Sequence, residues 1–577
     1  MRTGQTSRAR QAGNALLVTA VMSLLGLLTV AGALAWSMSS AKQTYRSNQY
    51  ACAGAAAEGA TEKVAAAMMW DYLHGNEQTV VNNLGAYRSS VPTSSDSSYW
   101  SGWAFNDTQG NAGRNYVEMT GLSNYLILSG TYAGMNGYVS TFQVVSDATQ
   151  TSAAQPVTAG VLQEIQLVRI PIFQFAMFSS GDLEISCGEP FVITGPVHSN
   201  GSMYVEPDDL MTFMSGVTAV GSILFARSPY DNRGAPAGSV VYEVPPVAEV
   251  PSLTLPLGFT NATASTLREL ILPPPAGEDP TSQTGQARLY NQADMIIIVS
   301  NNGFSATSGS FNSFGTTVPS NQLAEFVTTT NSFLDDRESK TVLPIDINVS
   351  NLVTWSATNS TIRAALGGQD VSSVYVCDDR TLNGNSVGAV RLNHGQKLPS
   401  RGLSVATADP LYVLGNYNQT NAANLGTSNT QTTLPASLAA DAVTALSPAW
   451  VDAMSTASLS SRVASPQTVN AAIVAGSVAT TNGNYGGGME NFIRFLEYWD
   501  TTVFTYNGSL INLFPSHYAT NAWGLSGVYQ PPTRNWAFDV NFNNPAKLPP
   551  LTPSLRKVCR SQWAAMAPNQ TNAPVIH

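Results

Sequence analysis

The chain has 577 residues, a formal net charge of −10 and only 11% charged residues. This acidic balance excludes a nucleic-acid-binding function, because such proteins present a basic face and the only basic cluster here is Arg2, Arg8 and Arg10. The length suffices for about two to four domains. The low charge means that uncharged polar residues supply much of the surface, as in exported β-rich proteins.

An apolar segment follows the N-terminal arginines. No charged residue lies between Arg10 and Lys42, and residues 15–38 are almost wholly apolar. As a helix this segment is roughly 36 Å long, and a bilayer core is ~30 Å thick. The preceding arginines place the N-terminus in the cytoplasm and the rest of the chain outside, as a single-pass inner-membrane protein. The predicted anchor residues are Leu16, Leu17, Val18, Leu24, Leu25, Leu27, Leu28 and Trp36.

The helix is predicted to continue beyond the membrane. Residues 41–73 are rich in Ala and contain no proline, and Val64, Met68 and Tyr72 recur at helical spacing. Gly75 is a plausible C-terminal stop. The pattern therefore predicts one continuous helix over 14–75.

The N-terminal residues resemble a known family. A basic leader (1–13) ending in Gly13, then NALLVTAVMSLLGLLTV, then an Ala-rich helix with AAAEGA resembles the type IV prepilin-like proteins, above all the PilX-like minor pilins. The resemblance implies cleavage by a prepilin peptidase between Gly13 and Asn14. It also implies a membrane-held helix that packs against other pilin-like subunits, with a body at the cell surface or on a pilus.

Two positions depart from the pattern of major pilins. That pattern has an apolar first mature residue and a glutamate at the fifth, where this chain has Asn14 and Val18. The resemblance therefore favours a tip, initiating or accessory subunit, or a permanent anchor, over a bulk filament subunit. Two other interpretations of the segment stay open: a plain signal-anchor, and a secretory signal cut after Ala33-Leu34-Ala35.

Residues 76–175 are predicted to form a small α/β or β unit. Strands are expected over 115–122, 124–130, 138–146 and 159–170, with a hairpin turn at 132–137. We expect this sheet to pack on the exposed half of the long helix, as in pilins.

The remainder is predicted to be a mainly β body, so the fold class is a long N-terminal helix, a pilin-like helix-plus-sheet unit, and a β-solenoid-like or sandwich body. Residues 176–227 form a short-strand segment, 228–370 a Pro-rich insertion with a mixed segment, and 371–577 a β-rich C-terminal body. A buried strand is expected at 294–300. Helices are expected at 321–336 and 490–499, and the last residues are expected to wrap the surface.

The four cysteines lie far apart, at Cys52, Cys187, Cys377 and Cys559. In an exported chain they permit two disulfides with three pairings, and free buried thiols are an equal alternative. No C-x-x-C pair is present, and no two of the five histidines have ligand spacing, so the sequence predicts no metal site and no cofactor.

Candidate catalytic motifs all favour a structural interpretation. Residues 384–388 match G-x-S-x-G, but a strand rather than a helix is expected after them, so we predict a hairpin loop. Asp378-Asp379-Arg380 and Glu206, Asp208 and Asp209 are predicted loop surface. His198 is predicted to be solvated or structural, and Gly486-Gly487-Gly488 lacks the residues of a phosphate-binding loop.

The sequence thus predicts a structural or assembly role without catalytic residues. One alternative is a surface adhesin that binds polysaccharide, which a row of exposed aromatic residues would favour. A less favoured alternative is a carbohydrate-active β-helix enzyme, which requires a cleft with converging carboxylates.

Overall fold

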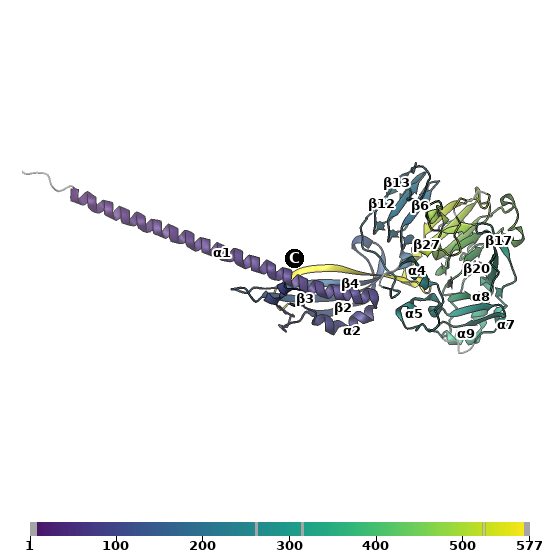
Figure 1. The fold of residues 1–577 in the computed structure, drawn as a ribbon, viewed down its shortest axis with the longest axis horizontal. Coiled ribbons are helices and arrows are strands. Elements are labelled where there is room, and N and C mark those ends of the chain that lie inside the picture. The colour runs from purple at the N-terminus through teal and green to yellow at the C-terminus, as the bar shows by residue number, and fades with distance from the viewer. Residues whose placement is uncertain (1–7, 260–262, 313–316, 522, 525–526, 571–577) are drawn as a thin grey trace, which may run out of the picture.

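The computed structural model describes residues 8–259, 263–312, 317–521, 523–524 and 527–570. A long helix, α1 (Arg8–His74), projects from an antiparallel sheet, and a large β body lies at the far end of that sheet (Figure 1). The predicted fold class, a long N-terminal helix followed by a mainly β body, is confirmed.

The C-terminal half of α1 packs on the sheet through small residues. Buried positions recur every three or four residues, as expected for one face of a helix: Ala53, Ala57, Ala60, Val64, Met68 and Tyr72. The alanines allow the helix to approach the strands closely. Two short helices, α2 (Glu77–Asn82) and α3 (Leu84–Arg88), turn the chain back toward the sheet.

The sheet has five antiparallel strands and includes the C-terminal part of the chain. β3 (Asn136–Gln150) pairs with both β1 (Trp103–Asn106) and β2 (Tyr116–Ile127), and β4 (Thr158–Pro171) lies between β3 and β29 (Ser554–Met566). The strands predicted at 115–122 and 124–130 are one bulged strand, β2. The C-terminal stretch was expected to wrap the surface, but its residues Ser554–Met566 form β29, so the body is an insertion between two neighbouring strands. Residues 571–577 lie outside the described part of the chain.

The first part of the body is a parallel β-solenoid with three strands per coil. Met177, Val197 and Val217 pair in register, which gives a repeat of 20 residues (177, 197, 217). The strands are β5 (Met177–Ser179), β6 (Leu183–Cys187), β7 (Phe191–Ile193), β8 (Val197–Ser199), β9 (Met203–Pro207), β10 (Leu210–Phe213), β11 (Val217–Ala219), β12 (Ile223–Leu224) and β13 (Ser239–Tyr242).

The second part of the body is another parallel stack with two main faces. One face contains β14 (Met295–Ser300), β19 (Ser373–Asp378), β21 (Leu403–Thr407), β23 (Ala436–Ala439), β25 (Gln467–Ser477) and β27 (Val503–Pro515). The other contains β18 (Lys340–Asn348), β20 (Ser386–Asn393), β22 (Leu411–Leu414), β24 (Val443–Leu446) and β26 (Ile493–Phe495). Peripheral elements are β15 (Gly303–Thr307), α7 (Ser320–Leu323), β16 (Val327–Thr328), β17 (Phe333–Asp335), α8 (Val349–Thr358), α9 (Ser360–Ala365) and β28 (Thr533–Phe538).

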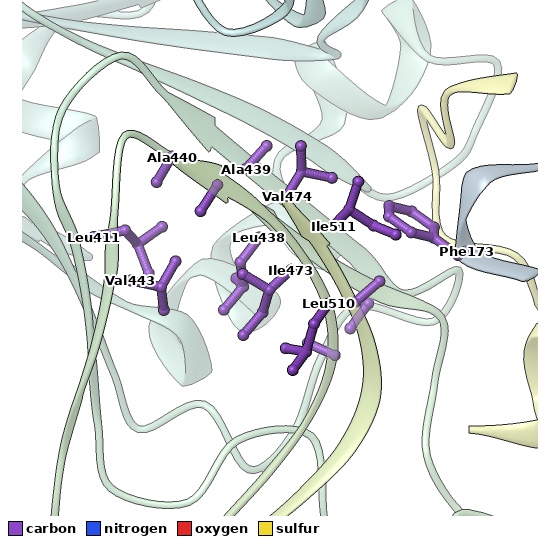
Figure 2. Packing of buried hydrophobic residues seen from close by; sticks show 14 of the residues in the cluster. Phe173, Leu411, Leu438, Ala439, Ala440, Val443, Ile473, Val474, Leu510 and Ile511 are labelled. Carbon is purple, nitrogen blue, oxygen red and sulfur yellow. The ribbon is translucent and has the colours of Figure 1, made fainter. Parts of the chain in front are cut away.

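The two stacks share one hydrophobic core, because β27 pairs in parallel with β5. One column of paired, buried apolar residues crosses both stacks: Met295, Val374, Val405, Leu438, Ile473, Leu510, Met177, Val197 and Val217. Figure 2 shows Leu438, Ile473 and Leu510 following one another within this column. Burying each such side chain stabilises the fold by about 1.5–3 kcal/mol. The solenoid alternative is therefore confirmed over the sandwich.

A strap, residues 243–294, connects the last coil of the first stack to the first strand of the second. Its prolines exclude it from central strands. Its described residues include the short helices α4 (Ala264–Leu267), α5 (Gln283–Ala287) and α6 (Leu289–Gln292) and the 3-10 helix η4 (Arg268–Leu270). Arg268 of the strap donates to buried Asp441 at 2.9 Å, and the hydroxyl of Tyr375 donates to the carbonyl oxygen of Ile271 at 2.6 Å. These bonds fasten the strap to the second stack.

Two predicted helices are wrong. The segment 321–336 contains the end of α7, then β16 and β17, and the segment 490–499 contains β26. In the second segment Ile493 and Phe495 face the main core, whereas Leu496 faces a separate cluster on the outside of the sheet. A strand segment buried on both faces has neighbouring apolar residues that imitate helical spacing.

Candidate functional site

The N-terminal half of α1 is apolar and exposed over its whole circumference. Leu16 is 75% exposed and Trp36 76% exposed, and the other predicted anchor residues Leu17, Val18, Leu24, Leu25, Leu27 and Leu28 are also exposed. Gly13 and Asn14 lie on this helix, ahead of the apolar residues. Within the described residues, α1 is the one helix long and apolar enough to cross a membrane. An apolar surface of this size calls for lipid or for other helices around it.

The joint between α1 and the sheet is closed by polar contacts from distant parts of the chain. Arg556 of β29 donates to the carbonyl oxygens of Tyr72 and Gly75 at the end of α1. The amide of Gln283 in the strap donates to the same Gly75 oxygen at 3.1 Å. A cavity of about 460 Å³ lies beside these contacts. The anchor is thus fixed to both the sheet and the body.

All four cysteines are free thiols in the structure. Cys52 is exposed on α1, Cys187 is buried, and Cys377 and Cys559 are partly buried. Burial raises the pKa of the Cys187 thiol to about 11. Three of the four thiols lie in surroundings that keep them protonated and unreactive.

The G-x-S-x-G match lies in a turn that leads into a strand. Ser386 is the first residue of β20, and no helix follows it before β21. A side chain at Gly388 would collide with the carboxylate of Asp378, which itself pairs with Arg380. These residues hold one coil against the next. The predicted hairpin is wrong, because β20 pairs in parallel with β18 and β22. The prediction of loop surface is also wrong for Asp378, which belongs to β19 and has a side chain only 3% exposed, whereas Asp379 is exposed.

Glu206 corrects a prediction, because its side chain is fully buried rather than on the loop surface. It accepts from the backbone N–H of Ser228 at 2.7 Å and from the hydroxyl of Tyr485 at 3.3 Å. Arg233 lies 3.4 Å from the same carboxylate. Burial raises the pKa of Glu206 to about 7. Because Tyr485 belongs to the second stack, this cluster joins the two stacks.

The other members of that predicted acidic group are more exposed. Asp208 pairs with Arg227, and Asp209 accepts from the backbone N–H of Leu210 at 2.7 Å. Both side chains complete turns of the solenoid.

His198 has a structural role inside the first stack. Its ring nitrogens contact Thr218 at 2.8 Å and Asn200 at 3.0 Å, and the ring stacks on Phe178. Burial lowers its pKa to about 4, so the imidazole is neutral. In the part of the chain that the structure describes, no three His, Cys, Asp or Glu side chains are grouped to hold a metal ion.

A polar groove of about 360 Å³ lies on the outer face of the sheet made by β18, β20, β22, β24 and β26. Its lining includes Asp335, Glu338, Lys340, Arg494 and Tyr518. The sequence analysis missed this groove, because its walls come from segments separated by more than a hundred residues. In the structure, Tyr412, Thr444 and Arg494 occupy paired positions on three successive strands of this sheet.

Tryptophans of the body do not form an exposed binding row. Trp355, Trp450, Trp499 and Trp536 are buried, and Trp523 is partly buried against the core. These side chains therefore contribute to packing. They do not supply the row of exposed aromatic residues that would favour the adhesin alternative.

Comparison with solved structures gives a weak likeness to a pilin. No protein-family model matches the chain, and no curated protein matches it. Among solved structures, the chain is similar to the competence-associated pilin ComZ from Thermus thermophilus, with 10% sequence identity over 78% of this chain and 87% of that chain. The TM-score is 0.27, which is too low to establish a shared fold.

Proposed function

We propose that this chain is a membrane-anchored, type IV pilus-like accessory subunit with a structural or assembly role. The observation that carries the proposal is the division of α1. Its first half is exposed and apolar, and its second half is packed on an antiparallel sheet. A helix built in this way can lie in a bilayer and then in a bundle of like helices, while the attached sheet and body stay outside.

The proposed partners are other pilin-like subunits and a prepilin peptidase. Val18 and Asn14, at the positions where major pilins carry other residue types, favour an accessory place over a bulk filament subunit. Two features support a structural role over a catalytic one. The motif residues at 384–388 and Asp378 are used in packing between coils, and His198 is enclosed in the core.

The decisive experiment is the N-terminal sequence of the mature protein purified from its native membrane. We expect a start at Asn14 with a methylated amine. Gly13→Val should block this cleavage, whereas Gly26→Ala, further along the same helix where no atom lies within 4 Å of the added carbon, should not.

Two other results would contradict the proposal. An intact Met1 start would indicate a plain membrane anchor. A start at Trp36 would indicate a secreted protein that has lost the anchor.

A further inference from the structure

A pocket of about 330 Å³ opens where the two stacks meet. The turn between β6 and β7, residues 187–191, forms its wall on the first stack. The second stack supplies Glu490, the turn at 500–501, Trp523 and residues 530–534. We call this site the seam pocket, and its volume is within the range of small-ligand sites.

Glu490 supplies the most buried carboxylate of the seam pocket. It belongs to the 3-10 helix η8 (Gly488–Asn491), which precedes β26. Gly488 lies so close to β6 that an added Cβ would be 2.5 Å from the carbonyl oxygen of Glu184. This close approach holds η8 against the first stack. The side chain of Glu490 is therefore only 12% exposed, although it still lines the pocket.

The carboxylate of Glu490 is incompletely partnered. Its one ion pair among the described residues is with Arg534, whose Nη1 lies 3.5 Å from Oε1. Strong charge-assisted hydrogen bonds are shorter, at about 2.7–2.9 Å. The Nη2 of Arg534 donates instead to the backbone carbonyl oxygen of Glu490, at 3.1 Å. Burial raises the pKa of the Glu490 carboxyl, as expected where no close donor stabilises the charged form.

Two further carboxylates lie at the mouth of the pocket. Glu189 and Asp500 both line it and are both exposed. Asp500 accepts from the hydroxyl of Tyr498 at 3.0 Å, which leaves its other oxygen free of described donors. The lining thus carries three carboxylates and a single guanidinium group. The Cys187 thiol in the same lining responds to this charge, because burial and then the nearby Glu490 raise its pKa.

The charged groups behind the pocket do not reverse this balance. Two arginines outside the lining, Arg227 and Arg233, act on the charge of Glu490. Arg227 forms an ion pair with Asp208, and Arg233 pairs with Asp231 at 2.8 Å. Each of these arginines has a carboxylate of its own. The excess negative charge of the lining is therefore available to a positively charged ligand.

Apolar rings make up much of the remaining lining. Phe191 is held by an edge contact with Trp536, with 5.8 Å between the ring centres. Pro531 and Pro532 line the pocket with it. The ring of Trp523 packs so closely on the chain that a Cβ on Gly487 would lie 2.4 Å from it. Such rings suit methylene groups and give them no polar partner.

We infer that the seam pocket binds an aliphatic diamine or polyamine. One ammonium group would lie at Glu490, the next at Glu189 and Asp500 at the mouth, and the methylene chain between them along the apolar rings. Carboxylates at two depths select a ligand with a charge at each end. A Ca²⁺ ion fits less well, because it needs six to eight oxygens around one point, and in the described residues no such group of three acidic or ligating side chains occurs. This inference does not depend on the anchor or on how the N-terminus is processed.

The test is calorimetric titration of the full-length chain in detergent with putrescine and with spermidine. Butylamine, which has one ammonium group, Mg²⁺ and a lysine-containing tripeptide serve as comparison probes. We expect both polyamines to bind at least about tenfold more tightly than any of the three, because only they can reach both sets of carboxylates. Their affinity should fall as salt is added.

Two variants separate the ends of the site. The double variant Glu189→Gln/Asp500→Asn should weaken polyamine binding about tenfold, to the level of butylamine, because it removes both partners of the outer ammonium group. Glu490→Gln should weaken the binding of butylamine as well.

The matched control is the double variant Glu243→Gln/Glu325→Gln. It removes two exposed carboxylates outside the pocket, so the change in net charge is the same and binding should be like that of the natural chain. Unchanged thermal unfolding of the mouth variant and of the control shows that the fold is intact.

Four outcomes would overturn the inference. Equal binding of butylamine would show that the mouth carboxylates take no part. Equal binding of Mg²⁺ would indicate a response to charge alone, and tighter binding of the tripeptide would indicate a protein partner. Absence of polyamine binding, or binding that the mouth variant leaves unchanged, would exclude the seam pocket as the site.

Discussion

The Nη1 of Arg556 donates to the carbonyl oxygen of Tyr72 at 2.9 Å, and the guanidinium carbon lies 5.5 Å from the centre of the Tyr72 ring. The last carbonyl groups of any helix lack partners within the helix. Here Arg556, in the C-terminal strand β29, supplies a donor for the carbonyl oxygen of Tyr72, at the point where the anchor helix ends and the sheet begins. The first helix and the last strand therefore stabilise each other directly.

Arg556→Met should loosen the end of α1. The variant loses two charge-assisted hydrogen bonds, each worth about 1.5–3 kcal/mol. The Tyr72 carbonyl oxygen loses this donor, whereas the Gly75 oxygen keeps the bond from Gln283. Hydrogen exchange of the backbone amides at 64–74, measured on the full chain in detergent, should accelerate by a factor of ten or more. Arg560→Met is the matched control, because Arg560 pairs with Glu62 at the surface and such a pair contributes about 1 kcal/mol or less. Equal acceleration in both variants would refute the special role of Arg556.

Gly201→Ala should destabilise the solenoid, because the added carbon would lie 2.6 Å from the backbone nitrogen of Asp182 in the preceding coil. Overpacking of this kind costs about 1–3 kcal/mol. Gly181→Ala, at the equivalent position one repeat earlier, meets no atom within 4 Å and should be tolerated. The midpoint of urea unfolding, followed by the fluorescence of the buried tryptophans, measures the difference. Similar midpoints for the two variants would contradict the close stacking of the coils.

The body should become less stable as the pH rises from about 5 to about 7. Burial raises the pKa of Glu497 from 4.5 to about 7, although it accepts from the Ser447 N–H and hydroxyl at 2.6 Å. Between these two pKa values the folded chain holds a proton that the unfolded chain has released. The stabilisation that comes from this proton is therefore fully present below about pH 4.5, and it is lost as the pH rises toward 7. The loss is on the order of 1–3 kcal/mol for one such group.

Glu497→Gln should reduce this dependence, because the amide cannot ionise. A slope remains from Glu206, whose pKa burial also raises to about 7. Thermal unfolding of the full chain at several pH values between about 5 and 8 gives the comparison. Glu325→Gln replaces an exposed carboxylate and should leave the slope unchanged. Parallel curves for the natural chain and Glu497→Gln would show that another group controls the pH dependence.

Cys52 should react with a membrane-impermeant maleimide in intact spheroplasts. It is exposed on α1, 14 residues beyond Met38 at the end of the apolar segment, on the side where the body lies. Cys187 is enclosed and its thiol stays protonated, so Cys52→Ser should abolish most of the rapid labelling. Labelling that requires disrupted membranes would place the body in the cytoplasm and contradict the predicted orientation.

The helix and most strands were predictable because their signals are local. The Ala-rich, proline-free segment up to Tyr72 specifies one helix, and turn residues mark the short strands of the solenoid. The pairing of β29 with β4 was not predictable, because its partner lies almost four hundred residues earlier and an edge strand need not alternate. The prediction that Glu206 lies on the surface failed for a similar reason. The groups that donate hydrogen bonds to its carboxylate belong to Ser228 and Tyr485, which are remote in sequence.

The sequence also carries a repeat of glycines that indicates a solenoid. Gly181, Gly201 and Gly221 occur at the same place in successive coils, beside the column Met177, Val197 and Val217. A search for internal repeats identifies such spacing and predicts a solenoid directly. The groove carries no comparable repeat, because its two walls lie on segments outside the regular coils.

The body leaves the sheet at Pro171 and returns at Ser554, and these two residues face each other in neighbouring strands. The backbone N–H of Ile172 donates to the carbonyl oxygen of Pro553 at 2.9 Å, just beyond that point. A load applied to the body is consequently shared between two covalent connections instead of one. The body cannot swivel about a single bond, and a pull on it is transmitted along β4 and β29 together to the helix that holds the chain in place (Figure 1).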